Sequence, residues 1–428
     1  MSGILSFLVT LAILYLDPFG LGAATDRYSK QLFYQLYAPF YDTKGQDHTS
    51  VVLVTDATAQ AMGGEWPVSY TAHAVMLEAI LEERPAALMI DILFLDQRDG
   101  LEDLKRVLRE NKEKDNIPVY VAAPPAQLGL GASVLDDLAP DVVKFVSVEI
   151  PDFYHDSQVY PPFTIQYEKQ DRFLLPSAAF QIMEDFCVSD KKAAWCPDDF
   201  SRDALSKDME VIWGVNPPNY AIIEGLEEEK EYEYIYPCEA IESLEYRFIN
   251  MMFSGRDTLR QTCFYTPTVE SHDIYNTVNK SFSRNIINDR VVFYGMKITG
   301  VHDNILPPTH FLTPGVHLHA MAMDNLIVYG EEYISEDNSN SKIVDNLDVI
   351  LALALTVLMI FYQRISQTNN LAGSISLGII FFVASFAVGL LATLVTFKIL
   401  NLPPMNWLAA SSMPIFVSVT GAAARSKR

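Results

Sequence analysis

The segment ALMIDILFL, residues 87–95, carries a single charged side chain, Asp91, and is followed by the polar stretch DQRDG. A short apolar run of this length is typical of a strand that is buried on both faces, as in a parallel sheet covered by helices. We therefore expect residues 87–95 to form a central strand of the fold.

The flanking sequence alternates between strand and helix patterns. VVLVTD (51–56) predicts a strand that ends in an acid, and IPVYVAAP (117–124) predicts a third strand. Residues 72–83 and the amphipathic segment GLEDLKRVLRENKEK (100–114) predict the helices between these strands. This β-α-β-α-β order indicates an α/β fold with a mainly parallel sheet and right-handed crossovers.

The rest of the polar region is less regular, and we find no internal repeat in it. Residues 125–285 contain many prolines and the acidic run EGLEEEKEYEYIYP (224–237), as expected of insertions at the edge of a sheet. Such a run could attract calcium or a basic partner, although most charge runs are solvated surface. Further elements are predicted as strands at 143–150, 209–215 and 290–296, and as helices at 176–186 and within 314–330.

The charge is distributed unevenly along the chain. There are 54 acidic and 31 basic residues in 428, a formal net charge of −23, yet the only acid from Asn346 onward is Asp348. The sequence therefore predicts an acidic polar body joined to a nearly uncharged apolar tail. An acidic surface would repel the phosphate backbone, so we expect no nucleic-acid partner.

Three apolar runs in the tail, 347–362, 374–397 and 407–424, approach the roughly 20 residues that cross a bilayer core. Residues 4–16 form a further apolar run, which we interpret as an uncleaved anchor rather than a signal peptide. We expect four transmembrane helices, with the lipid bilayer as a partner. A hydrophobic hairpin inside a soluble domain is the alternative for the tail. The expected divisions are an anchor (1–24), an outer domain (25–345), a three-helix bundle (346–424) and a basic tail (425–428). A polar linker at residues 336–342, at the end of the outer domain, leads into the first helix of the bundle.

The positive-inside rule gives the expected orientation. Arg364 and the terminal RSKR should face the cytoplasm, whereas Lys398 is the one opposing charge in a short loop. Both termini would then be cytoplasmic, and the large domain would be periplasmic or extracellular. In a bacterium this corresponds to a multi-pass protein of the inner membrane.

All four cysteines lie in the expected outer domain, where an oxidising compartment favours disulfides. Of the three connectivities we favour Cys187–Cys196 with Cys238–Cys263. A zinc site is the rival interpretation, but the chain has no C-x-x-C spacing.

Several short motifs occur in a familiar order: Trp66-Pro67 followed by His73-Ala74, DILF (91–94), LPSAA (175–179), VVFYG (291–295), Asp303, PGV (314–316) and HLHAMAMDNL (317–326). Together with the expected arrangement of transmembrane helices, these motifs resemble the CHASE type 2 (CHASE2) family, a class of bacterial extracellular sensor domains associated with cyclases and histidine kinases. The resemblance covers most of the chain and implies a sensory role.

The chain departs from the family pattern in two places. Val68, Ser69 and Tyr70 stand where the family commonly has a second Trp-Pro and an Arg, which weakens any expectation of anion binding there. Family members usually continue into a kinase, cyclase or phosphodiesterase domain, whereas this sequence stops at Arg428. The resemblance therefore implies a standalone sensor that relays its signal to a separate effector protein.

The first candidate ligand site consists of Asp56, Trp66, His73 and Asp91. Asp56 ends the first predicted strand, Asp91 would lie one strand over, and open α/β sheets bind ligands at this carboxyl edge. The alternative is structural: Trp66 and Pro67 would pack a corner, and His73 would be a hydrogen-bonded residue at a helix start, with Ser69 or Thr71 as the helix cap.

The second candidate lies in KITGVHDNILPPTHFLTPGVHLH, which holds His302, His310, His317 and His319. In an extended segment His317 and His319 would share a face, as metal ligands often do, but helical spacing would splay them. We therefore treat them as weak metal candidates. Asp303 and His319 complete the set of candidate ligand-binding residues.

Catalytic signatures such as G-x-S-x-G, H-E-x-x-H, a Walker loop or a dinucleotide fingerprint are absent from the sequence. We expect no enzymatic activity and no cofactor; an anchored hydrolase would lack a recognisable nucleophile and base. The leading hypothesis is a membrane-bound sensory or ligand-binding module that acts on a separate kinase, cyclase or regulator. The rival is a docking subunit of a cell-envelope assembly.

Small residues recur in the second apolar run of the tail and just before it. They would allow close helix packing, including packing against a second copy of the chain, and they are Gly373, Gly378, Ser385 and Gly389.

Overall fold

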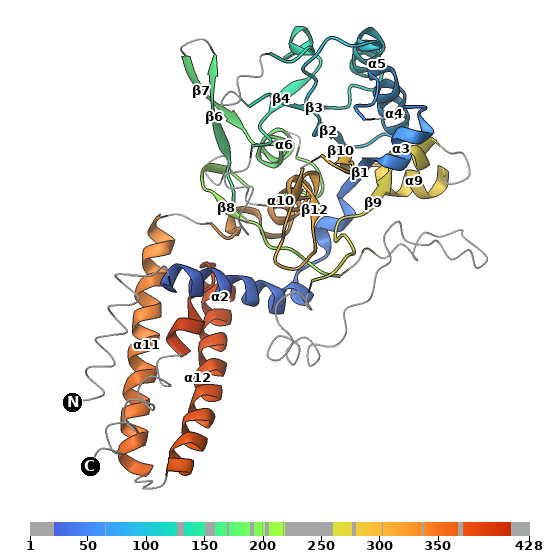
Figure 1. Cartoon of the computed structure of the whole chain (residues 1–428). Coiled ribbons are helices and arrows are strands. Elements are labelled where there is room, and N and C mark those ends of the chain that lie inside the picture. Colours follow the sequence, from blue (N-terminus) through green and yellow to red (C-terminus); the bar gives the residue numbers. More distant parts are fainter. Residues whose placement is uncertain are drawn as a thin grey trace. The chain divides into compact units, whose positions relative to one another are not determined.

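A computed structural model describes residues 21–64, 66–125, 132–149, 159–168, 171–188, 192–198, 200–201, 205–216, 218, 260–275, 280–301, 303–335, 338–366 and 371–411. The chain divides into two compact units. One is formed by residues 37–333, and the other combines residues 1–36 with residues 334–428. Figure 1 shows the elements of both units.

The first unit is built on a six-stranded sheet with the order β4-β3-β2-β10-β1-β9. Every pairing in this sheet is parallel, so the predicted α/β class and the mainly parallel sheet are confirmed. The strands are β1 (Thr49–Thr55), β2 (Ala87–Ile90), β3 (Val119–Ala122), β4 (Lys144–Val146), β9 (Thr268–Glu270) and β10 (Val291–Lys297).

The strand β10 lies between β1 and β2, because Phe293 pairs with Val51 on one side and with Met89 on the other. Asp91 is therefore two strands away from the end of β1, and the expectation of one strand was wrong. All of β10 up to Tyr294 is fully buried, as suits a strand at the centre of a sheet with both faces covered. Nothing in the order of the chain indicates that this late strand inserts between the first two.

One face of the sheet packs against helices that connect the strands. Val52, Leu88, Ile90, Val292 and Tyr294 point into this core, together with the apolar side of α4 and α5. The Ser69 hydroxyl caps α4 by accepting a hydrogen bond from the Ala72 N–H at 3.2 Å. The helices on this side are α3 (Asp56–Ala61), α4 (Tyr70–Glu82), α5 (Leu101–Lys114), α8 (Ser271–Tyr275) and α9 (Lys280–Ile287).

The opposite face is covered by α10 (Val316–Tyr329), which packs on β1 and β10 with α6 (Ala178–Cys187) beside it (Figure 1). Gly295 makes this approach possible, since a Cβ there would lie 2.5 Å from the Cβ of Val316. The helix α10 is buried almost all round, and its Asn325 amide exchanges two hydrogen bonds of 2.9 Å with the backbone of Ile212. The buried Asn325 side chain is thus hydrogen-bonded to the backbone rather than to water.

Several predicted strands are shorter in the structure. The strand expected over 87–95 ends at Ile90, and Ile92 and Phe94 are buried in the core as part of a loop. In the segment 209–215 only Met209–Glu210 is a strand, although Val211, Ile212 and Trp213 are also buried. An apolar run predicts burial, and here burial extends beyond the sheet. The remaining short strands form the pairs β5 (Val159–Tyr160) with β8 (Met209–Glu210), β6 (Phe163–Glu168) with β7 (Asp171–Pro176), and β11 (Asn304–Ile305) with β12 (Thr313–Pro314).

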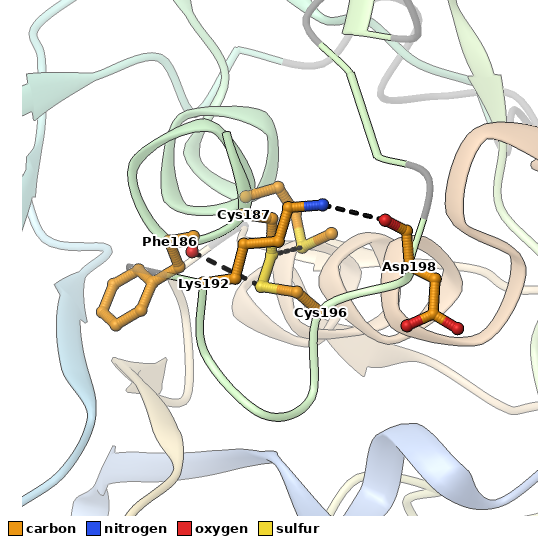
Figure 2. Close-up of a disulfide and its surroundings, with 6 residues drawn as sticks. Phe186, Cys187, Lys192, Cys196 and Asp198 are labelled. Atoms are coloured by element: carbon orange, nitrogen blue, oxygen red, sulfur yellow. Dashed lines mark hydrogen bonds between the residues drawn. A yellow bond between two sulfur atoms is a disulfide. The ribbon is translucent and has the colours of Figure 1, made fainter. Parts of the chain in front are cut away.

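The predicted disulfide Cys187–Cys196 is confirmed, and it ties the last residue of α6 to the loop that follows (Figure 2). In the same loop the Lys192 ammonium donates a hydrogen bond to the backbone carbonyl of Asp198 at 2.9 Å, as Figure 2 also shows. Cys263 is disulfide-bonded as well. Its predicted partner, Cys238, lies outside the described residues.

The second unit contains α2 (Leu21–Tyr37), α11 (Asn338–Ser366) and α12 (Leu371–Leu400). Within the part of the chain that the structure describes, one helical stretch, Val383–Leu400 of α12, is long and apolar enough to cross a membrane. The predicted runs 347–362 and 374–397 lie inside α11 and α12. The run 4–16 and most of 407–424 lie outside the described residues. The predicted limits of the polar linker were partly wrong, because residues from Asn338 onward already belong to α11.

Residues 401–411 hold the second unit together. The Trp407 indole N–H donates to the Ser29 carbonyl at 3.2 Å, and the Ser29 hydroxyl donates to the Asn406 side chain at 3.1 Å. Gly389 faces the same segment, since a Cβ there would lie 2.8 Å from the Ser411 hydroxyl. This small residue of α12 thus allows the close helix packing that the sequence suggests.

Candidate ligand site at the carboxyl edge of the sheet

Asp91 follows β2 directly, at the carboxyl edge of the sheet. Its N–H donates to the Tyr294 carbonyl at 2.8 Å, which continues the ladder one residue beyond the strand. Ile90 and Ile92 point into the core on the α4 side, so the Asp91 side chain lies on the side of α10. This side chain is 11% exposed.

Asp303 comes from the loop that joins β10 to α10. Its carbonyl accepts a hydrogen bond from the Gly315 N–H at 2.9 Å, which fixes the loop against the start of the helix. A Cβ at residue 315 would lie 2.5 Å from Asp303 Oδ1, so the glycine leaves room for the carboxyl group. Burial, followed by the neighbouring Asp303 carboxyl, raises the pKa of Asp91 well above its ordinary value. Burial raises the pKa of Asp303 to about 6.

His319 lies in the first turns of α10 and faces the Asp91 carboxyl group. It is 2% exposed, and its Nε2 lies 3.9 Å from Asp91 Oδ2. Its Nδ1 forms a hydrogen bond of 2.7 Å with the hydroxyl of Tyr160 in β5. Burial lowers the pKa of His319 to about 3, so the imidazole is neutral at physiological pH.

The hydrogen bonds of Tyr160 assign the tautomer of His319. The Tyr160 oxygen accepts a hydrogen bond from the Ala179 N–H at the start of α6, at 3.3 Å. Its own proton is then best used as a donor to the His319 Nδ1. The remaining imidazole proton resides on Nε2 and points toward Asp91. The site therefore combines two carboxyl groups with one N–H donor.

Sequence reasoning named Asp91, Asp303 and His319 but did not bring them together, and it missed Tyr160. Long insertions separate these residues in the sequence. They come together because β10 pairs with β2 and α10 follows β10 in the chain. LPSAA, which contains Ala179, was the nearest available signal. Tyr160 itself lies in an irregular proline-containing stretch with no recognisable pattern.

The structure gives His73 a place in the core, where it is 2% exposed. Its Nδ1 forms a hydrogen bond of 2.8 Å with the Tyr294 hydroxyl, and its ring packs edge-on against Phe94. Burial, with a smaller contribution from Arg98, lowers the pKa of His73 to about 4. The structural interpretation of this histidine is the one that the geometry supports.

Trp66 and Asp56 contact other residues than those that surround Asp91. Trp66 is half-buried and packs against the core on the α4 side. The exposed Asp56 carboxylate accepts hydrogen bonds from the Thr299 hydroxyl at 2.6 Å and from the Thr299 N–H at 3.2 Å. Asp56 thus braces the loop after β10, and of the first candidate set only Asp91 faces Asp303 and His319.

The remaining histidines are divided among different partners. His310 bonds Gln261 at 2.8 Å and Thr309 at 2.7 Å, whereas His317 stacks on Phe264 with ring centroids 4.0 Å apart. His302 lies outside the described residues. Among the residues that are described, no group of three or more His, Cys, Asp or Glu side chains is arranged to hold a metal ion.

Comparison with known proteins agrees with this architecture. The family model described as the CHASE2 domain matches residues 7–362. No curated protein and no solved structure matches the chain significantly. On the strength of a match that covers most of its length, the chain belongs to the CHASE2 domain family, a family of extracellular sensor domains.

Proposed function

We propose that the chain is an integral membrane sensory module whose extracytoplasmic CHASE2 domain binds a ligand and relays the signal to a separate effector protein. The observation that carries the proposal is the CHASE2 match over residues 7–362. The carboxyl-edge site of Asp91, Asp303 and His319 supports it, because open α/β sheets bind ligands at this edge. We assign binding rather than catalysis to the site, since the sequence carries none of the catalytic signatures sought in it.

Membrane integration is supported by the surface of the tail helices. Val383–Leu400 has the length and composition of a membrane span. Large apolar side chains are exposed along α11 and α12, among them Ile350 (61%), Leu391 (61%) and Ile399 (71%). Contiguous apolar surface of this kind is rare on proteins that contact only water. We propose an N-terminal anchor, three tail spans, cytoplasmic termini and a location in the bacterial inner membrane.

Signalling across the membrane requires two arrangements of the protein for which the ligand has different affinities. We propose that a kinase, cyclase or other regulator responds to this difference. The test is purification of the tagged chain from native membranes in mild detergent, with an unrelated tagged membrane protein as control. A regulator recovered at near-equal stoichiometry is the expected result. Recovery of envelope or appendage subunits instead would contradict the sensory proposal.

The second candidate function is a docking subunit of a cell-envelope assembly. The observation that favours it is the β6–β7 hairpin, on which Phe163, Phe173 and Leu174 are 37%, 43% and 60% exposed. Exposed aromatic and aliphatic side chains on one small element are typical of protein interaction sites. If this candidate is right, the Leu174→Asp variant loses its co-purifying proteins while its melting temperature stays unchanged.

A further inference from the structure

The loop between β11 and β12, residues 306–312, presents large apolar side chains to solvent. Leu306, Phe311 and Leu312 are 39%, 45% and 62% exposed. Ile305 of β11 pairs with Thr313 of β12, so the loop is short and its two ends lie side by side. Apolar side chains gathered on one exposed loop are typical of a surface that contacts another apolar phase or molecule.

The loop is held in place by the backbone of Gln261. The Gln261 N–H donates to the Thr309 carbonyl at 2.9 Å, and the Gln261 carbonyl accepts a hydrogen bond of 3.0 Å from the Phe311 N–H. The Gln261 side-chain amide also forms a hydrogen bond of 2.8 Å with His310, which is 1% exposed. The apolar side chains are therefore held outward by a fixed backbone, and little conformational entropy remains to be lost when they are covered.

The loop and its flanking strands carry no acidic or basic residue. Residues 304–314 have the sequence NILPPTHFLTP, whereas charged residues make up 20% of the chain and give it a net charge of −23. An anionic lipid surface repels acidic protein surface, and burial of a charged side chain in lipid is costly. This segment is subject to neither penalty. It also lacks the carboxylates with which an acidic protein would attract a basic protein partner.

The first unit of the fold begins and ends at one place. It comprises residues 37–333, and near its two limits the rings of Tyr41 and Tyr329 pack edge-on with centroids 5.9 Å apart. Both connections to the tail helices therefore start from the same part of the unit. A double tether of this kind gives that part a high effective concentration near the tail.

The loop belongs to this tethered part of the unit. The ring of Trp213 packs against His310 of the loop, with centroids 5.6 Å apart. At the next residue, a Cβ on Gly214 would lie 2.8 Å from the ring of Tyr41. Phe40, which precedes Tyr41, is 58% exposed and adds a further large apolar side chain here.

We propose that the loop of residues 306–312, together with Phe40, is a membrane-contacting surface that inserts its apolar side chains into the bilayer that holds the tail helices. The side chains would enter the boundary between the headgroups and the acyl chains, where apolar groups of peripheral elements are buried. The contact would limit the tilt of the sensor domain, so that a change in the domain moves its two tethers rather than the domain as a whole.

This inference rests on the proposed membrane integration of the tail and goes beyond it, because a domain on two tethers can also stand clear of the bilayer. The experiment therefore contains a separate probe for each. Full-length single-site variants are labelled with a nitrobenzoxadiazole maleimide and reconstituted in liposomes of phosphatidylcholine and phosphatidylglycerol. Their fluorescence is compared with that in liposomes whose acyl chains are brominated near the headgroup, since bromine quenches only on close contact.

Leu312→Cys probes the loop, and Leu391→Cys, in the candidate span Val383–Leu400, probes the tail. Leu174→Cys is the matched control, because Leu174 is the same residue type with almost the same exposure, 60%, on the β6–β7 hairpin. The label at residue 312 should lose about half as much fluorescence as that at residue 391, because an interfacial side chain reaches only the acyl boundary. The label at residue 174 should lose none.

The wild-type chain, treated in the same way, gives the background labelling. Circular dichroism shows whether each variant is folded, and Phe311→Cys is a second probe of the same loop. Quenching at residue 391 without quenching at 311 or 312 overturns this inference alone. No quenching at any of these positions overturns the membrane integration as well. Equal quenching at 312 and 174 overturns a specific role of the loop. Blue-shifted emission at 312 without bromine quenching would show that a protein surface, such as a second copy of the chain, covers the loop instead.

Discussion

Asp324 lies in the middle of α10, is fully buried, and accepts a hydrogen bond of 2.6 Å from the Tyr41 hydroxyl. Burial raises its pKa to about 8. Between the pKa of the unfolded chain, about 3.9, and this folded value, the folded protein keeps a proton that the unfolded chain releases. The contribution of Asp324 is therefore fully present below the unfolded pKa and is lost as pH rises to about 8.

The Asp324→Asn variant tests this dependence, because Asn keeps the acceptor for Tyr41 and cannot ionise. We expect the free energy of unfolding of wild type, relative to the variant, to fall by up to about 1.4 kcal/mol per pH unit between pH 5 and 8. Chemical unfolding in detergent micelles at several pH values measures the difference, in which most other titrating groups cancel. Parallel pH profiles for the two proteins would show that Asp324 is ionised in the folded state.

The hydrogen bond between His73 and Tyr294 gives a second prediction. Tyr294→Phe leaves the buried Nδ1 of His73 without a partner, which should lower the free energy of unfolding by about 1–3 kcal/mol. Tyr70→Phe is the matched control, because its hydroxyl donates at 2.8 Å to the carbonyl of the exposed Asp96, which water can replace. Urea unfolding of both variants is the measurement. Equal losses would argue against a special role for the buried pair.

Single residues were predictable from the sequence to different degrees. His73 was recognisable as a hydrogen-bonded residue near a helix start, and Ser69 as a cap, because both depend on local chemistry. Asp91 was named from its place at the carboxyl edge of a predicted strand, and Asp303 and His319 were named through the family resemblance. Their convergence depends on strand order, and Tyr160 carries no local signal at all.

At the scale of elements, the packing of α10 on β10 depends on Gly295. Gly295→Ala would place a methyl group 2.5 Å from the Val316 Cβ, so the start of the helix must move. We expect a loss of about 1–3 kcal/mol, the usual cost of overpacking a core.

Gly64→Ala is the control for this substitution, since no atom lies within 4 Å of a Cβ at that position. Its stability should change little. Thermal melting of the two variants, followed by circular dichroism, compares them. A Gly295→Ala variant as stable as Gly64→Ala would mean that the helix start adapts without strain.

The elements that the sequence predicted well are those with strong local patterns. The helices α4, α5, α6 and α10 agree with their predicted ranges within a few residues. Strand limits agree less well, because Ile92 and Phe94 reach the core without joining the sheet. The position of β10 between β1 and β2 was not predictable, since hydrophobicity specifies that a strand is buried but not which neighbours it has.

For the whole molecule, the charge distribution predicted the essential division into an acidic body and an apolar tail. The structure has two compact units, and the exposed apolar surface of the second belongs to α11 and α12. One span, Val383–Leu400, has the length and composition to cross a membrane. The central claim, that the CHASE2 domain lies outside and both termini lie inside, stays a prediction.

Cysteine labelling in intact spheroplasts tests that claim most directly. The Glu113→Cys variant adds a thiol on the exposed side of α5, and Ser426→Cys adds one in the C-terminal tail. The wild-type chain is the blank, because Cys187, Cys196 and Cys263 are disulfide-bonded. We predict that a membrane-impermeant maleimide modifies the Glu113→Cys variant in intact spheroplasts and the Ser426→Cys variant only after lysis. The reverse pattern would place the CHASE2 domain in the cytoplasm and contradict the account.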